Sequence, residues 1–257
     1  MRLGTFNLMH GRSLHDGRVV AERLRAAVAL LDPDVLGLQE VDRHQPRSGG
    51  ADLTAEVAAA MGAAHHRFVA TLYGTPGVDG RPGPPAAAGT ACYGIGMASR
   101  WPVRCWHTTM LPAAAVAAPV FVPGPGGGLR WLRDEPRALL AAVVESPAGP
   151  LTVATTHLSF VPGWNVRQLH LVLRELGRLP GPRVLLGDLN LPAAAVTLVP
   201  GWRALARRPT YPAPMPRVQL DHVLTGRRGG VLPAVRRVET PAVGLSDHRP
   251  LVVELAG

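Results

Sequence analysis

The chain has 257 residues, of which 47% are hydrophobic, and it carries a formal net charge of +9 at pH 7. This apolar content is enough for one core, so we expect a single domain over residues 1–257, and the lack of a long apolar run excludes a membrane-spanning helix. The charge favours an anionic partner, but all 27 basic residues are arginine, so the base composition of the gene explains the charge equally well.

Strand and helix signals alternate along the first half of the chain. Residues 2–8 are predicted to form a strand, residues 19–31 carry an apolar stripe at helical spacing, and residues 35–39 form a short buried strand. Asp52 can cap a second helix that runs through residue 61. Further strands are predicted at residues 67–72, 93–99, 103–111, 138–145 and 151–156.

The second half repeats this order, with a helix over residues 166–179 that leads into a strand at 183–186. Two similar halves predict an α/β fold in which two packed mixed β-sheets are flanked by helices, giving four layers. Residues 74–89 and 112–128 are rich in proline and glycine and are predicted to be loops that flank the two halves of a hairpin. Tolerated surface insertions explain these loops better than an overhang of the site does.

The location of the protein and the state of its cysteines are predicted from the signal and cysteine patterns of the sequence. No signal-peptide pattern precedes the first strand, so we expect a cytoplasmic monomer that does not insert into membranes. Cys92 and Cys105 are the only cysteines. A hairpin that turns at residues 99–102 would place Cys105 opposite Gly96, so both cysteines are expected to remain thiols.

Polar residues gather beside several predicted strands. Gly187-Asp188-Leu189-Asn190 follows one apolar run and Ser246-Asp247-His248-Arg249 precedes another. Hydrolysis of a phosphoester needs a nucleophilic water and neutralised phosphoryl oxygens, both of which a hard cation held by carboxylates supports. The sequence has no G-x-S-x-G, H-E-x-x-H, C-x-x-C or P-loop motif, so metal-assisted attack by water is the favoured chemistry.

Six segments resemble, in kind, order and spacing, the endonuclease/exonuclease/phosphatase superfamily, which includes DNase I, AP endonucleases, sphingomyelinases and inositol polyphosphate 5-phosphatases. They are the two motifs above together with Thr5-Phe6-Asn7, Leu38-Gln39-Glu40, Thr155-Thr156-His157-Leu158 and Leu220-Asp221-His222-Val223. The resemblance covers nearly the whole chain and implies a DNase I-like fold.

The resemblance also implies a metal site. Glu40 matches the principal metal ligand, and Asp247 matches another ligand that binds directly or through water. Asn7 matches the amide that orients either Glu40 or the metal. Since all these donors are oxygens, the expected ion is Mg²⁺, with Mn²⁺ as a substitute.

Five further residues match the catalytic positions of the family. Asp188 and Asn190 would orient or deprotonate the attacking water and hold the phosphate. His157 would contact the scissile phosphate, and His248 would do so with Asp221 fixing its tautomer. Either Asp188 or His248 can be the general base.

Substrate contacts are predicted from the residues around these motifs. Arg137, Asn165 and Arg167 could reach an anionic substrate, although surface ion pairs explain the two arginines equally well. Ile95 stands where many members of the family carry an amide, so a phosphate contact at that position is in doubt.

Three classes of function fit the sequence. A phosphodiesterase that acts on nucleic acid is slightly favoured by the charge, although Met9 stands where AP endonucleases commonly carry an aspartate. The alternative is a phosphomonoesterase, or a sphingomyelinase-like phosphodiesterase, that acts on a small or lipid phosphoester, although no long apolar hairpin like that of secreted sphingomyelinases stands out. A non-catalytic anion-binding module is disfavoured because the charged set is intact.

Overall fold

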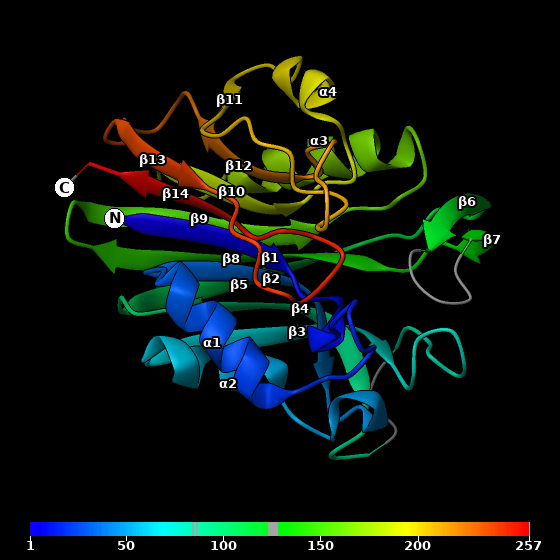
Figure 1. Cartoon of the computed structure of the whole chain (residues 1–257). Helices are drawn as coiled ribbons and strands as arrows, with labels where there is room; N and C mark the ends of the chain where they lie inside the picture. Colours follow the sequence, from blue (N-terminus) through cyan, green and yellow to red (C-terminus); the bar gives the residue numbers. More distant parts are fainter. Residues whose placement is uncertain (84, 86, 123–127, 257) are drawn as a thin grey trace.

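Two six-stranded sheets face one another in a computed structural model that describes residues 1–83, 85, 87–122 and 128–256 (Figure 1). The first sheet has the strand order β13-β14-β1-β2-β4-β3 and the second β11-β12-β10-β9-β8-β5. The strands of the first sheet are β1 (Arg2–Asn7), β2 (Val35–Arg43), β3 (His65–Tyr73), β4 (Cys92–Ser99), β13 (Val235–Glu239) and β14 (Leu251–Leu255). Those of the second are β5 (Val103–Leu111), β8 (Arg137–Ser146), β9 (Gly149–His157), β10 (Arg183–Asp188), β11 (Trp202–Ala204) and β12 (Asp221–Gly226).

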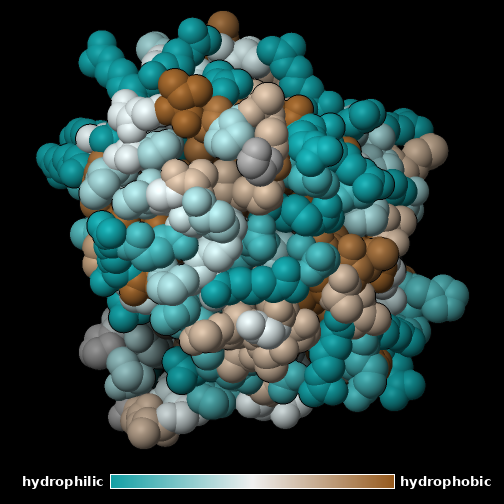
Figure 2. All heavy atoms as spheres, turned by 90° about the vertical axis from the view of Figure 1, so that its left-hand side faces the viewer, coloured by the Kyte–Doolittle hydropathy of each residue, from teal (hydrophilic) through white to brown (hydrophobic). Residues whose placement is uncertain are grey.

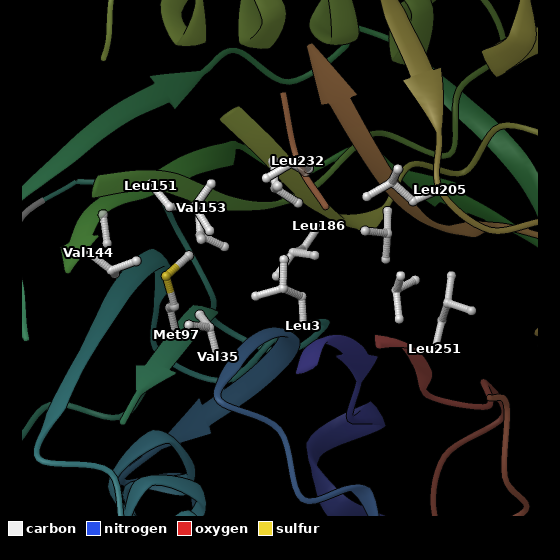
Figure 3. Close-up of a cluster of buried hydrophobic side chains, with 14 of the residues drawn as sticks. Leu3, Val35, Met97, Val144, Leu151, Val153, Leu186, Leu205, Leu232 and Leu251 are labelled. Carbon is white, nitrogen blue, oxygen red and sulfur yellow. The ribbon is translucent and has the colours of Figure 1, made fainter. Parts of the chain in front are cut away.

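The main core lies between the two sheets. Leu3, Val35 and Met97 of the first sheet point towards Val153 and Leu186 of the second, and all five are buried (Figure 3). Alternate residues of a strand face opposite sides, so each of these strands has a second apolar set for an outer layer.

Helices cover both outer faces. The helices α1 (Ala21–Leu31) and α2 (Leu53–Met61) pack on the first sheet through residues such as Val28 and Val57. The helices α3 (Trp164–Leu176) and α4 (Ala193–Thr197) pack on the second. The predicted four-layer α/β sandwich is therefore confirmed (Figure 1). The predicted cap is confirmed as well, because the Asp52 side chain accepts a hydrogen bond from the Ala55 backbone N–H at 3.1 Å.

Parallel pairing brings the ends of four central strands to one end of the sandwich. In the first sheet β1 runs parallel to β2 and Asn7 pairs with Gln39. In the second sheet β9 runs parallel to β10 and His157 pairs with Asp188, which also pairs with Asp221 at the start of the antiparallel β12. Polar residues that are far apart in the sequence thus become neighbours.

The two sheets approach closely near this end. A Cβ on Gly37 would lie 2.6 Å from Thr155 Oγ1 of the opposite sheet, so only glycine fits there. Beside it, the buried Gln39 accepts a hydrogen bond from Thr5 Oγ1 at 3.1 Å and donates one to Thr155 Oγ1 at 2.8 Å. This polar link fixes the register of the sheets just below the site.

The opposite end of the sandwich carries both chain termini. Figure 2 shows this end, where the surface is largely hydrophilic and the apolar side chains form small separate groups. None of the described helices is long and apolar enough to cross a membrane.

One predicted strand pairing is wrong, and two predicted helices form with shifted bounds. The strands β4 and β5 do not form a hairpin, because β4 pairs with β2 and β3 whereas β5 pairs with β8 of the other sheet. The predicted helices over residues 19–31 and 166–179 are Ala21–Leu31 and Trp164–Leu176. Cys92 and Cys105 are free, as predicted, although the pairing used to argue this does not exist.

The segment 112–128 is not a simple loop. It contributes β6 (Ala117–Val122), which pairs with β7 (Gly128–Arg133) in a separate two-stranded sheet that projects from the sandwich (Figure 1). Leu129 and Trp131 of β7 are strongly exposed, and they alternate with Arg130 and Leu132 along the strand. Residues 84, 86 and 123–127 of the two predicted loops lie outside the described residues.

Candidate active site

Asn7 joins the two sheets at the polar end of the sandwich. It is buried at the end of β1, and its Nδ2 donates to Glu40 Oε1 at 3.0 Å and to Asp188 Oδ2 at 3.0 Å. Its Oδ1 accepts the Met9 backbone N–H at 3.1 Å, which fixes the orientation of the amide. One side chain therefore positions a carboxylate from each sheet.

The Asp188 loop is held by local contacts. Gly187 has a φ of 150°, and a Cβ there would collide with the Thr156 carbonyl of the neighbouring strand. Asp188 Oδ1 accepts the Asn190 backbone N–H at 2.9 Å, and Asn190 Nδ2 donates to the Leu158 carbonyl at 3.0 Å. These bonds hold Asn190 at a positive φ of 49°.

His248 lies between two aspartates. Its Nδ1 is 2.8 Å from Asp221 Oδ2, and its Nε2 is 3.7 Å from Asp188 Oδ2. The Tyr211 ring packs on the imidazole with the ring centroids 4.9 Å apart. Burial alone would lower the pKa of His248, but the charges of Asp221 and Asp188 outweigh it and hold that pKa well above its usual value.

His157 has the opposite electrostatic environment. Burial, and then the positive charges of Arg137 and His248, hold the pKa of His157 well below its usual value, so this imidazole is neutral. Arg137 Nη1 lies 3.2 Å from His157 Nδ1, and a guanidinium can only donate. Asn190 Nδ2, which also can only donate, lies 3.3 Å from His157 Nε2, so the neutral ring can accept from only one of these two donors. His157 Nε2 also lies 3.5 Å from Asp188 Oδ2.

Glu40 is aimed into the site by an irregularity in β2. The register of β2 against β4 shifts between Leu38 and Val41, so Gln39 and Glu40 both face Ile95 as a β-bulge. Glu40 has a positive φ of 53°. Such strained conformations concentrate at functional sites, where surrounding contacts stabilise them.

The donor set around Glu40 suits a hard cation. Burial, and after it the negative charge of Asp247, raise the pKa of Glu40 to about 7. Two carboxylates that disfavour each other's ionisation are stabilised by a bound cation. The oxygens of Glu40, Asp247 and the Asn7 amide are the donors that Mg²⁺ prefers, so the residues fit the predicted metal.

A second cluster of potential ligand atoms lies beside this one. Atoms of Asp188, Asp221 and His248 lie within 4.8 Å of one another. The short bond between His248 Nδ1 and Asp221 Oδ2 already accounts for two of these residues, and a protonated imidazole repels a cation. An acid-base group explains this cluster better than a second metal does.

The residues predicted to touch the substrate lie in three different environments. Arg137 is buried and lies under His157, with its Nη2 3.5 Å from Asp134 Oδ1. Asn165 is buried and donates to the Asn190 carbonyl at 2.8 Å. Arg167 is exposed and stacks over the Trp164 ring at 4.6 Å. Their contact with substrate stays a prediction.

Sequence reasoning did not identify Tyr211, and it did not predict the surroundings of Ile95 and Arg137. Tyr211 precedes a proline between the Asn190 and Asp221 motifs, and this weak signal does not single out the ring that packs on His248. Ile95 is buried in the core between the sheets, and its hydrocarbon side chain offers no donor to a phosphate. The contact of Arg137 with His157 depends on the pairing of β8 with β9, which brings residues 20 positions apart together.

Carboxylates, imidazoles and amides at the strand ends of a four-layer sandwich define a DNase I-like phosphoesterase. The family model of the endonuclease/exonuclease/phosphatase family matches residues 4–248. The chain therefore belongs to this family, whose members hydrolyse phosphoester bonds and generally use a divalent metal. No curated protein matches the chain.

Solved structures of the family match over the full chain. An endonuclease/exonuclease/phosphatase from Beutenbergia cavernae DSM 12333 is 26% identical, with a TM-score of 0.67 and coverage of 100% of this chain and 72% of that one. The mannosyl-6-phosphatase Bt3783 from Bacteroides thetaiotaomicron is 15% identical with a TM-score of 0.65, and the coverage is 100% of both chains. Sphingomyelinase C from Streptomyces griseocarneus is 18% identical with a TM-score of 0.61, and the coverage is 100% of this chain and 99% of that one. The last two similarities concern the fold alone.

Proposed function

We propose that the protein is a Mg²⁺-dependent phosphoester hydrolase in which a water molecule attacks the phosphorus. The observation that carries this proposal is the pair of hydrogen bonds from Asn7 to Glu40 and Asp188, each 3.0 Å long. They connect Glu40, whose carboxylate suits a metal, with Asp188, whose carboxylate lies close to the imidazoles of His157 and His248. A cation site and an acid-base site thus share one buried amide.

Glu40 and Asp247 would hold the metal, with Asn7 orienting Glu40. The bound cation would neutralise charge on the phosphoryl oxygens and lower the pKa of bound water. Mn²⁺, which accepts the same oxygen donors, is expected to substitute.

The proton path runs through Asp188 in this proposal. Asp188 accepts the proton of the attacking water, and burial, which raises the pKa of this carboxyl to about 6, supports such a role. His248 is held by Asp221 with its Nε2 towards the reacting group, where it donates to a phosphoryl oxygen. His157 Nε2 and Asn190 Nδ2 would contact the remaining phosphate oxygens.

The test is hydrolysis of a substrate panel with Mg²⁺ or Mn²⁺. The panel contains plasmid DNA, RNA, an abasic duplex, sphingomyelin, inositol phosphates and mannose 6-phosphate. We expect hydrolysis of at least one substrate by the wild type and by Asp32→Asn, an exposed control, and its loss in Asp188→Asn. Folded wild-type protein that hydrolyses none of them with either metal would contradict the proposal.

A nuclease is the second candidate, and exposed arginines support it. Arg203, Arg207, Arg208 and Arg217 are all exposed on the segment between the Asn190 and Asp221 motifs. If they bind phosphates, duplex binding by Asp188→Asn should weaken about 10²-fold between low and physiological salt. Replacing Arg207 and Arg208 with glutamine should flatten that slope, and an absence of binding at low salt would remove the candidate.

A further inference from the structure

A cavity of about 350 Å³ opens beside His248. Three loops form its walls: the one after β1, which carries Leu14 and His15, the one before β12, which carries Ala213 and Pro214, and residues 242–249 before β14. Small-molecule pockets usually begin at about 300 Å³, so this volume can hold a ring or a chain of several carbon atoms.

The cavity borders the candidate active site at His248. His248 lines it and is also bonded to Asp221 at 2.8 Å. The Ala213 backbone N–H donates to the Asp247 carbonyl at 2.7 Å, which ties the cavity wall to the predicted metal ligand. A molecule with its phosphoryl group at His248 would therefore place its neighbouring atoms in the cavity.

The lining is mostly apolar, and its one guanidinium is held against the cavity wall through Nε. Arg249 Nε donates to the Ala213 carbonyl at 2.7 Å, and Nη2 lies 3.5 Å from the Pro214 carbonyl. A nucleic acid would bring further phosphates close to the scissile one, and buried phosphates need free cationic donors. The apolar lining of the cavity therefore suits a hydrocarbon group better than it suits further phosphates.

We infer that this cavity binds an apolar organic group esterified to the substrate phosphate. The substrate class is then a small phosphoester with an aliphatic or aromatic alcohol, rather than a nucleic acid. This inference rests on the proposed hydrolase function and adds the substrate class to it. Burial of each methylene should raise kcat/KM about threefold to fourfold until the cavity is full.

The experiment measures hydrolysis of dimethyl, dibutyl and dihexyl phosphate by the full chain with Mg²⁺. These diesters have leaving groups of similar reactivity, so a rise with chain length reports binding of the alkyl group. We expect kcat/KM to rise by about 30-fold or more from dimethyl to dibutyl phosphate. Calorimetry with methylphosphonate and hexylphosphonate should show the same preference without turnover.

Two variants narrow the cavity from different loops. Ala242→Phe and His15→Trp change exposed residues of the lining, so both should fold. They should lower kcat/KM for dibutyl and dihexyl phosphate more than for dimethyl phosphate and so remove the dependence on chain length. Ala29→Phe, at an exposed position of α1, is the matched control and should behave as the wild type.

The outcomes separate this inference from the proposed function. Equal kcat/KM along the series, or faster hydrolysis of DNA or RNA than of every diester, would overturn the inference and keep the hydrolase. A chain-length effect that both narrowed variants retain would also overturn it. If the folded protein hydrolyses no phosphoester with Mg²⁺ or Mn²⁺, the proposed function fails and the inference fails with it.

Discussion

The two halves of the candidate site differ in how their charges are balanced. On the side of the second sheet, His248 balances Asp188 and Asp221 within the protein. On the side of the first sheet, Glu40 faces the negative charge of Asp247, which together with burial raises the Glu40 pKa. The acid-base half thus carries its own counter-charge in the folded chain, whereas in the proposed function the carboxylate half would receive its counter-charge from a bound cation.

The largest effect is expected at the residue shared by both halves. Asp188 accepts hydrogen bonds from Asn7 and Asn190 and faces His157 and His248. Asp188→Asn removes the proposed base and should lower kcat by about 10³-fold or more. Steady-state kinetics with the best substrate of the panel measures it, with Asp32→Asn as the control. A kcat within a few-fold of the wild type would show that Asp188 is not the base.

The next effect concerns Asp221 and His248 as a unit. Because Nδ1 of His248 is bonded to Asp221, removing either partner disables the other. Each single alanine variant should lose about 10²-fold in kcat, and the double variant should lose about the same. Losses that multiply in the double variant would contradict the pairing.

A stability effect is expected at Arg137, the buried residue that contacts His157 of the acid-base half. The side chains of Arg137 and Asp134 are both buried and lie 3.5 Å apart, so Arg137→Gln removes the charge partner of a buried carboxylate that also accepts a hydrogen bond from the Ala114 N–H. The free energy of unfolding should fall by about 3 kcal/mol. Urea denaturation compares it with Arg167→Gln, an exposed arginine whose loss should change stability by less than ~0.5 kcal/mol. Equal changes in the two variants would contradict the structural role of Arg137.

The smallest effect is the pH dependence of the metal-free protein. The folded state raises the pKa of Glu40 from 4.5 to about 7, so it binds this proton more tightly than the unfolded state does. The contribution of Glu40 to stability is therefore most favourable below pH 4.5 and is lost as the pH rises towards 7. Glu40→Gln should flatten this decline in thermal unfolding with a chelator present. If stability still declines with rising pH in Glu40→Gln, the decline belongs to another titratable group.

The sequence predicted the layers of the fold better than it predicted the connections. Apolar periodicity and the Asp52 cap depend on local residues, so α2 ends at Met61 as expected. The separation of β4 from β5 into two sheets depends on which distant strands pair, and periodicity carries no such information. The β6–β7 hairpin was missed because its proline and glycine content is typical of loops.

The candidate site follows the same division. Motifs identified Asn7, Asp188, Asp221 and His248 because each stands at or near a strand end. Glu40 was identified because it follows an apolar run, although the structure places it at a bulge within β2. The bond from Asn7 to Asp188 joins residues 181 positions apart and exists only because the two sheets pack face to face. The β-bulge that aims Glu40 and the Tyr211 ring on His248 also depend on tertiary packing.

The most direct test of the two-half account is a calorimetric titration of Mn²⁺ into the wild type, Glu40→Gln and Asp221→Asn, with hydrolysis measured on the same samples. If Glu40 holds the metal, Glu40→Gln loses both metal binding and turnover. Asp221→Asn should bind metal with nearly the affinity of the wild type while its turnover falls. Metal affinity that is unchanged in Glu40→Gln, or lost equally in both variants, would contradict it.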